Sequence, residues 1–177
     1  MTEPAPSAAP AGVASLVSSL ARVLETPGVL SQGDIARLRR MDPRQPEAAF
    51  FKLEGLLLDN RLPGDAAART ELETRWAAVI VGLAQLGSLH RPGVRLGHAL
   101  AGAEWSEIRF ARLMRAGSEQ LVDDLPSLAR FLRAKGVAAD WTGAADLILT
   151  AGTRHEAEVR RHVARDYYGL AARNDND

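Results

Sequence analysis

The chain of 177 residues contains no cysteine. This absence excludes a disulfide framework and thiolate metal sites, and nothing else in the composition points to an oxidising compartment. No apolar run approaches the length needed to span a bilayer, and Met1 to Ala11 lack the basic start and continuous apolar segment of a secretory signal. The sequence therefore predicts a cytoplasmic protein with no membrane partner.

Local motifs for catalysis, metal binding or phosphate binding are also missing. The four histidines form no HExxH pair, and no segment matches GxxxxGK[ST], GxGxxG or GxSxG. Neighbouring carboxylates such as Asp123 and Asp124 point in different directions on a helix. We therefore predict no catalytic residue, no metal site and no cofactor, and we expect that the protein is not an enzyme.

Lysine is scarce in this chain. The two lysines are Lys52 and Lys135, and the other 20 of the 22 cationic residues are arginine. The formal net charge is zero, which argues against a globally basic nucleic-acid-binding domain. Codon usage in a GC-rich genome is the favoured explanation of the arginine excess. The alternative is functional, since guanidinium groups suit bidentate phosphate contacts. The positions of the arginines must decide between these explanations.

Strand-like alternation is absent, and apolar residues recur at three- and four-residue steps along nearly the whole chain. This pattern predicts an all-α fold, a compact single-domain bundle of about eight to nine short and medium helices over residues 12–170. Residues 1–11 are rich in proline and alanine, and we expect a disordered lead there. Residues 171–177 are predicted to be a disordered tail.

Capping residues and breakers predict where several helices begin. Ser31 is the expected N-cap of a short helix, and Pro46 lies in the first turn of a helix that carries Phe50, Leu53, Leu56 and Leu57 toward the core. Thr70 and Glu73 match a capping box ahead of a central core helix. Asp140 is a fitting N-cap. Later helices are predicted at about 96–100, 107–116, 119–123, 125–135, 141–151 and 156–170.

Arginines project away from the apolar stripe on three of these predicted helices. At 100° per residue, each helix places two arginines outward, and Tyr168 lies beside the last pair. Arg39 and Arg109 lie at the borders of their apolar stripes. The predicted nucleic-acid-binding residues are Arg37, Arg39, Arg40, Arg109, Arg112, Arg115, Arg161 and Arg165.

A solvated helix face is an alternative interpretation of each arginine group taken alone, with Glu107 and Asp166 as local acidic partners. Three such faces in one neutral protein favour a surface that follows a phosphate backbone, because backbone binding needs several cations together. Whether the three faces converge is left open by the sequence.

A series of short segments, read in order and spacing, resembles the CasB family, the small subunit of the type I-E CRISPR surveillance complex Cascade. The resemblance covers residues 31–168. The segments are Gly33-Asp34 with Leu38-Arg39-Arg40, Trp76 with Gly82-Leu83-Ala84, Leu96-Gly97 with Ala99-Leu100, Glu107-x-Arg109-Phe110-x-Arg112-Leu113, Leu132-Arg133-Ala134-Lys135-Gly136, Asp140-Trp141, Arg160-Arg161 and Ala164-Arg165-Asp166-Tyr167-Tyr168.

The resemblance implies a non-catalytic protein that acts in antiviral defence. Its implied partners are guide RNA, target DNA and the displaced strand, the Cascade backbone and large subunits, and a second copy of itself within the complex. It would stabilise the R-loop through contacts with the nucleic-acid backbone, while base pairing reads the sequence.

Three other functions stay open from the residues alone. A helical small-molecule-binding regulator should contain a deep apolar cavity with a few convergent polar groups. A helical hydrolase should contain clustered acidic residues with perturbed pKa values. A protein-only structural adaptor would use its exposed faces to bind protein.

Overall fold

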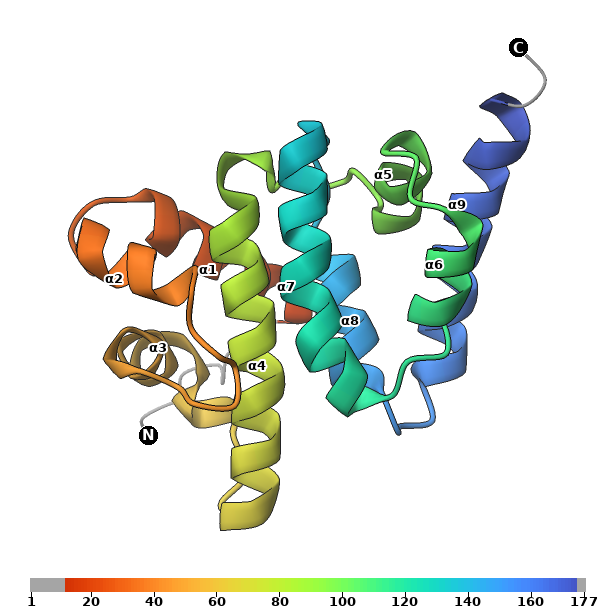
Figure 1. The fold of residues 1–177 in the computed structure, drawn as a ribbon. Coiled ribbons are helices and arrows are strands. Elements are labelled where there is room, and N and C mark those ends of the chain that lie inside the picture. The colour runs from red at the N-terminus through yellow and green to blue at the C-terminus, as the bar shows by residue number, and fades with distance from the viewer. Residues whose placement is uncertain (1–11, 175–177) are drawn as a thin grey trace, which may run out of the picture.

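The computed structural model describes the backbone of residues 12–174 and the side chains of residues 12–170. Within that part the chain forms helices and no strand, which confirms the predicted all-α fold. The α-helices are α1 (Val13–Glu25), α2 (Gln32–Leu38), α3 (Ala48–Leu53), α4 (Ala66–Leu86), α5 (Leu96–Gly102), α6 (Glu107–Leu113), α7 (Ser118–Lys135), α8 (Thr142–Thr150) and α9 (Glu156–Asn174) (Figure 1).

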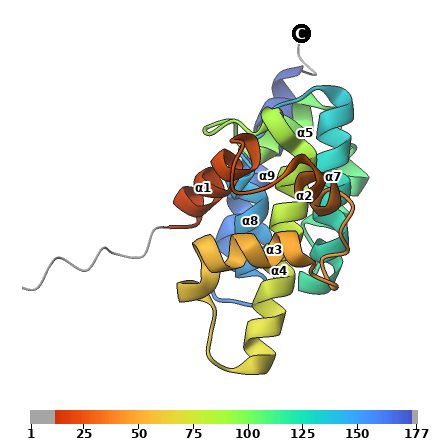
Figure 2. The ribbon, with the colours of Figure 1, turned by 90° about the vertical axis from the view of Figure 1, so that its left-hand side faces the viewer.

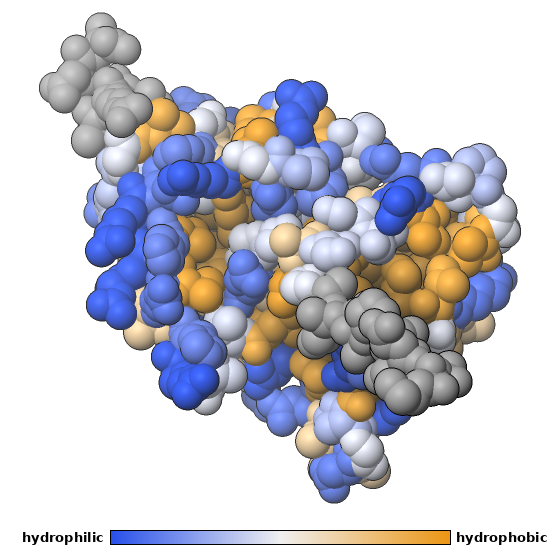
Figure 3. Space-filling view, turned by 180° about the vertical axis from the view of Figure 1, so that it is seen from behind, coloured by the Kyte–Doolittle hydropathy of each residue, from blue (hydrophilic) through white to orange (hydrophobic). Residues whose placement is uncertain are grey.

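Two long helices, α4 and α7, run side by side in the middle of the molecule (Figure 1). Helices α1, α2 and α3 pack on one side of this pair, and α5, α6 and α9 lie on the other (Figures 1 and 2). Seen from behind, the surface is mostly hydrophilic with separate hydrophobic patches (Figure 3). The central pair therefore separates two lateral groups of helices.

Helix α4 is buried all round in its C-terminal half, where every residue from Trp76 to Leu86 is buried. Such a helix has neighbours on all sides. One of these neighbours is Trp141, whose indole Nε1 donates to the Val79 carbonyl at 3.0 Å. A Cβ atom on Gly82 would lie 2.3 Å from the Trp141 ring, so the glycine permits this close contact. The prediction that this is the central core helix is confirmed.

The predicted start of α4 was wrong. The helix begins at Ala66, and the side chain of its N-cap, Asp65, accepts a hydrogen bond from the Ala68 amide at 2.9 Å. Thr70 lies inside the helix and donates to the Ala66 carbonyl at 3.0 Å. Glu73 pairs with Arg69 at 2.8 Å instead of closing a capping box. An earlier capping residue therefore adds a full turn to the helix.

The prediction of two helices at 119–123 and 125–135 was also wrong, because α7 is continuous with Pro126 inside it. Proline lacks an N–H group, so the helix loses the hydrogen bond to the Val122 carbonyl. The buried side chains of Leu121, Leu125, Leu128 and Leu132 continue as one stripe through this point. Tertiary packing along that stripe outweighs the local break.

The third predicted helix also differs in detail. It begins at Ala48 rather than at Pro46, and it continues as a π-helix from Glu54 to Leu58. The wider turn rotates the following side chains, so that Leu58 is buried while Leu56 is 52% exposed. The expectation that Leu56 faces the core was therefore wrong.

Asp140 does not serve as the N-cap residue of α8, whose N-cap is Trp141. The Asp140 carboxylate instead accepts hydrogen bonds from the amides of Thr142 at 3.0 Å and Gly93 at 2.9 Å. Helix α9 continues to Asn174, so residues 171–174 of the predicted tail are helical. The rest of that tail and the predicted lead over residues 1–11 lie outside the described residues.

The contact between α5 and α9 gives a test of the fold. A Cβ atom on Gly97 would lie 2.3 Å from the Val163 carbonyl oxygen and 2.7 Å from the Tyr167 amide nitrogen, both of which are backbone atoms. We predict that Gly97→Ala lowers the free energy of unfolding by about 1–3 kcal/mol, measured by urea denaturation. Gly102→Ala is the matched control, because nothing lies within 4 Å of its added Cβ. Equal stability of the two variants would contradict the packing described here.

Candidate nucleic-acid interface

Helices α6 and α9 lie against each other, and three contacts fix their arrangement. The rings of Phe110 and Tyr167 stack with centroids 3.9 Å apart. The Tyr168 hydroxyl donates to Glu107 Oε1 at 3.2 Å. At the other end, the Arg160 guanidinium donates to the carbonyls of Met114 and Ala116. The start of α6 therefore meets the later part of α9, and the two helices are antiparallel.

This arrangement brings two of the three predicted arginine faces next to each other. We call the resulting area the α6–α9 surface. Its members are exposed side chains of the two helices and their ends: Ile108, Arg109, Arg112, Arg115, Arg161, Arg165 and Tyr168.

Three cations of the α6–α9 surface have no partner within the described residues, since Arg112, Arg115 and Arg165 make no hydrogen bond or ion pair there. The two acids considered as local partners are engaged elsewhere. Asp166 forms an ion pair with Arg95 at 2.9 Å, and Glu107 accepts the hydrogen bond from the Tyr168 hydroxyl. Neither acid forms an ion pair with Arg112, Arg115 or Arg165, although the charge of Glu107, whose hydrogen-bond partner is neutral, remains beside them.

The other two arginines of the surface make local contacts. Arg109 lies over the Trp105 ring, with its Cζ 5.4 Å from the ring centroid, which is cation–π geometry. Arg161 Nε donates to the Ala157 carbonyl of its own helix at 3.1 Å. Both side chains remain exposed.

Two apolar or aromatic side chains accompany these cations. Ile108 is 84% exposed and lies four residues before Arg112 on the same side of α6, whereas Arg115 lies in the turn after the helix. Tyr168 is 44% exposed and packs edge-on against Phe110. Partial burial and the hydrogen bond to Glu107 raise the pKa of Tyr168, which keeps its phenol neutral. The surface thus combines cations with groups that can stack or pack.

The third predicted arginine face lies at the C-terminal end of α2, with Arg37 in the helix and Arg39 and Arg40 directly after it. This helix is on the opposite side of the α4–α7 pair from α6 and α9 (Figures 1 and 2). Arg37 and Arg40 are exposed and make no hydrogen bond or ion pair through their side chains within the described residues. Arg39 is exposed too, but its Nε donates to the Ala84 carbonyl of α4 at 3.0 Å. Arg39 therefore also helps to attach α2 to α4.

The start of α2 is fixed by polar contacts around one carboxylate. Ser31 and Asp34 form a reciprocal capping box, which confirms the predicted N-cap. Lys52 Nζ lies 2.9 Å from Asp34 Oδ2. The hydrogen bond from Lys52, followed by those from Ser31, lowers the pKa of Asp34 to about 2. This carboxylate therefore remains charged and ties α2 to α3.

Two further arginines, Arg130 and Arg133 on α7, were missed by the sequence analysis. Arg130, Arg39 and Arg40 line a groove of about 310 Å³ between the end of α2, α4 and α7. Arg133 Nη1 donates to the Gln85 carbonyl at 2.9 Å. The signal was present for Arg130, which lies opposite the leucine stripe of α7, whereas Arg133 lies on the flank of that stripe, roughly 110° from its centre at 100° per residue. We call this second area the α2–α7 surface, formed by Arg37, Arg39, Arg40, Arg130 and Arg133.

Other arginines hold the fold together. Arg69 binds Glu54, Asp59 and Glu73 near the start of α4. Arg75 donates to the carbonyls at the end of α8 and pairs with Glu71. In these internal ion pairs, carboxylates are held by arginines of the core contacts and not by the exposed arginines of the two surfaces. A neutral chain can therefore carry surfaces that are locally positive.

No group of three histidine, aspartate or glutamate side chains that could hold a metal ion occurs among the described residues. In the same part of the chain, no helix combines the length and apolar character needed to cross a membrane.

The fold and the two surfaces define an all-helical protein that presents unpaired arginines on opposite sides of a central helix pair. A family model described as CRISPR-associated protein Cse2 matches residues 34–168. The chain therefore belongs to the Cse2 family, which confirms the resemblance to the CasB family of type I-E Cascade.

Two solved structures share the fold. A crystal structure of CasB from Thermobifida fusca is 19% identical, with a TM-score of 0.66 over 88% of this chain and 97% of that chain. A chain in the crystal structure of E. coli Cascade bound to a PAM-containing dsDNA target is 22% identical, with a TM-score of 0.64 over 88% of this chain and 96% of that chain. No curated protein matches significantly.

Two neighbouring arginines of α9 should differ in what they contribute to stability. Arg160 donates to two carbonyls and pairs with Glu156, whereas Arg161 makes only a contact within its own helix. We predict that Arg160→Gln costs about 1–3 kcal/mol of unfolding free energy, because two carbonyls lose their donor. Arg161→Gln should change it by less than about 0.5 kcal/mol. Thermal and urea unfolding measure both, and the reverse order would contradict the assigned contacts.

Proposed function

We propose that this chain is a non-catalytic subunit of a type I-E Cascade complex, in which it binds nucleic acid through its phosphate backbone without reading sequence. It would stabilise the paired guide RNA and target DNA and hold the displaced strand. Membership of the Cse2 family supports this assignment. The observation that carries it is the α6–α9 surface, where Arg112, Arg115 and Arg165 have no internal partner among the described residues.

Unpaired arginines are the form of positive charge that backbone binding uses. An arginine already held by a carboxylate gains little from a phosphate, whereas an exposed and unpaired guanidinium can donate two parallel hydrogen bonds to phosphate oxygens. Binding also releases the counterions condensed on the nucleic acid, which makes the affinity depend on salt. Several such groups on adjoining helices supply this effect together.

The exposed Ile108 and Tyr168 favour a strand with accessible bases. Bases of a single strand can stack on an aromatic ring or pack against an aliphatic side chain, and such contacts tolerate any sequence. Both residues adjoin the unpaired arginines of the α6–α9 surface. We therefore assign the displaced strand to this surface.

The proposed partners follow from the same assignment. The guide RNA, the target DNA and the displaced strand meet the arginine surfaces. Faces on which arginines are already paired with acids, such as that around Arg69, would meet the Cascade backbone and large subunits or a second copy of this chain. The protein would act in the cytoplasm.

A salt series of binding measurements tests the proposal. Affinity for single-stranded DNA and for an RNA–DNA hybrid should fall as salt rises, whatever the sequence. In a variant with Arg112, Arg115 and Arg165 changed to Gln, the slope of log affinity against log salt should decrease by about 2 for the single strand, at roughly 0.7 per lost contact.

The matched control changes Arg22, Arg91 and Arg154 to Gln, which removes the same charge from exposed positions outside both surfaces. We expect this control to keep most of the affinity and the original slope. Equal losses in the two triple variants would show a response to net charge alone. Binding that does not depend on salt would refute backbone recognition.

A further inference from the structure

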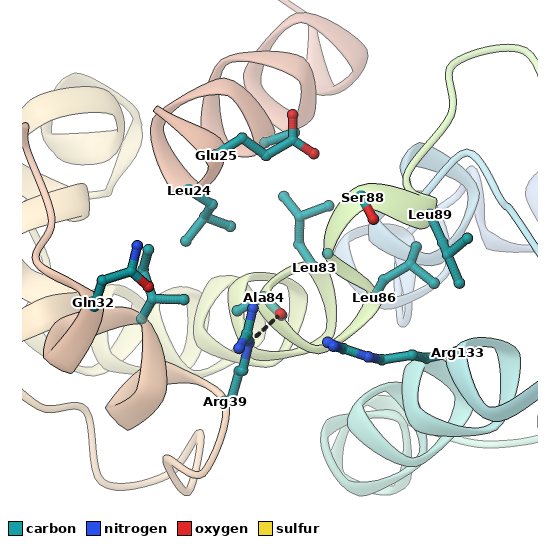
Figure 4. A pocket seen from close by; sticks show the side chains of 13 residues that line it. Leu24, Glu25, Gln32, Arg39, Leu83, Ala84, Leu86, Ser88, Leu89 and Arg133 are labelled. Atoms are coloured by element: carbon teal, nitrogen blue, oxygen red, sulfur yellow. Dashed lines mark hydrogen bonds between the residues drawn. The ribbon is translucent and has the colours of Figure 1, made fainter. Parts of the chain in front are cut away.

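The C-terminal end of α4 opens into a cavity of about 520 Å³, which the α6–α9 surface does not include. Residues of α1, α2, α4, the turn after α4 and α7 line it (Figure 4). Its apolar lining comes from leucine, isoleucine and alanine side chains, among them Leu24, Ile35 and Leu83. Polar groups are added by Glu25, Gln32, Arg39, Ser88 and Arg133.

Two guanidinium groups are held side by side in this cavity by consecutive carbonyls of α4. Arg39 Nε donates to the Ala84 carbonyl at 3.0 Å, and Arg133 Nη1 donates to the Gln85 carbonyl at 2.9 Å. Figure 4 shows the two side chains arriving from different helices and pointing toward each other. A guanidinium has five N–H donors, so each group keeps donors for a ligand. Both groups are therefore fixed before any ligand arrives.

The charge at this end of the cavity is positive. The C-terminus of α4 contributes roughly half a negative charge, and the two guanidinium groups outweigh it. The Glu25 carboxylate lies across the cavity from Arg133 (Figure 4). The cavity therefore has a cationic side, an apolar lining and a hydrogen-bond acceptor opposite the cations.

We propose that this cavity binds one nucleotide. The phosphate lies between Arg39 and Arg133, and the base packs on the apolar side chains of Leu24 and Ile35. Glu25, Gln32 and Ser88 offer hydrogen bonds to the base edge, and Glu25 can accept one from an exocyclic amino group. The volume falls within the roughly 300–1,000 Å³ typical of small-ligand sites.

The nucleotide can be free or part of a strand, and the proposal in its strand form rests on the proposed function. Arg39 belongs to both this cavity and the groove that contains Arg40 and Arg130. A strand lying on the α2–α7 surface would therefore pass the mouth of the cavity. A carboxylate-rich peptide fits less well, because it offers no planar base to pack on the apolar lining.

The test titrates the full chain with adenosine monophosphate, adenosine, inorganic phosphate and a short single-stranded DNA, using calorimetry. Two variants change the cavity in different ways. Arg133→Gln removes one cation, and Ser88→Trp fills the space from an exposed position while keeping both arginines in the chain. Arg154→Gln is the matched control, since it removes an equal charge from an exposed position outside both surfaces.

We expect both cavity variants to weaken nucleotide binding about tenfold or more, because Arg133→Gln removes a charge-assisted contact and Ser88→Trp removes the space. The control should change nucleotide affinity little. Adenosine monophosphate should bind more tightly than adenosine or phosphate, because base and phosphate each contribute. If Ser88→Trp weakens the binding of DNA but not of adenosine monophosphate, the bound nucleotide is part of a strand. If Ser88→Trp also weakens the binding of adenosine monophosphate, the cavity accepts the free nucleotide too.

The proposal is overturned if Ser88→Trp changes binding of neither ligand, or if an acidic peptide displaces the nucleotide more readily than phosphate does. If neither cavity variant changes the binding of DNA or of adenosine monophosphate, while DNA binding is lost in the Arg112, Arg115 and Arg165 triple variant, the nucleotide site is overturned and the proposed function stands. Nucleotide binding that depends on the cavity, in a chain that binds no DNA, supports the site and refutes the proposed function.

Discussion

The complete burial of the C-terminal half of α4 is the constraint on which the rest of the molecule depends. Eleven consecutive residues from Trp76 to Leu86 are buried, so helices must cover every side of this segment. Trp141 closes one side by packing on Gly82 and donating to the Val79 carbonyl. The helices that cover α4 also carry the arginines of the α2–α7 surface, so core packing determines where that positive charge lies.

The arginines of the chain divide into two groups with different physical roles. One group is neutralised within the protein, as Arg69 is by three carboxylates and Arg160 is by Glu156 and two carbonyls. The other group, which includes Arg112 and Arg165, is exposed without a partner in the described part of the chain. The first group stabilises contacts between and within helices and consumes acidic side chains. The second group keeps its charge available for phosphate, which explains how a protein with zero net charge can present basic surfaces.

Periodicity predicted the all-α fold, the central helix and the exposure of six of the eight selected arginines, because each depends on which side of a helix meets the core. It failed where a longer-range contact outweighs a local signal. Pro126 indicated a break, yet the leucine stripe of α7 continues through it. Arg133 already lay within the predicted helix over 125–135, but its carbonyl partner, Gln85, lies 48 positions away in the sequence, where periodicity gives no signal. Whether two helix faces adjoin depends on tertiary contacts, such as that between Arg160 and Met114. A helical wheel describes one helix at a time and cannot predict such contacts.

Photo-cross-linking of the full chain to a single-stranded DNA, followed by identification of the linked peptides, tests the central claim most directly. Unpaired arginines should determine where the strand lies. The account predicts cross-links in α6 and in the part of α9 that contains Arg161, Arg165 and Tyr168, and loss of these links at high salt. Cross-links concentrated around Arg69, where the cation is already neutralised by three carboxylates, would contradict it.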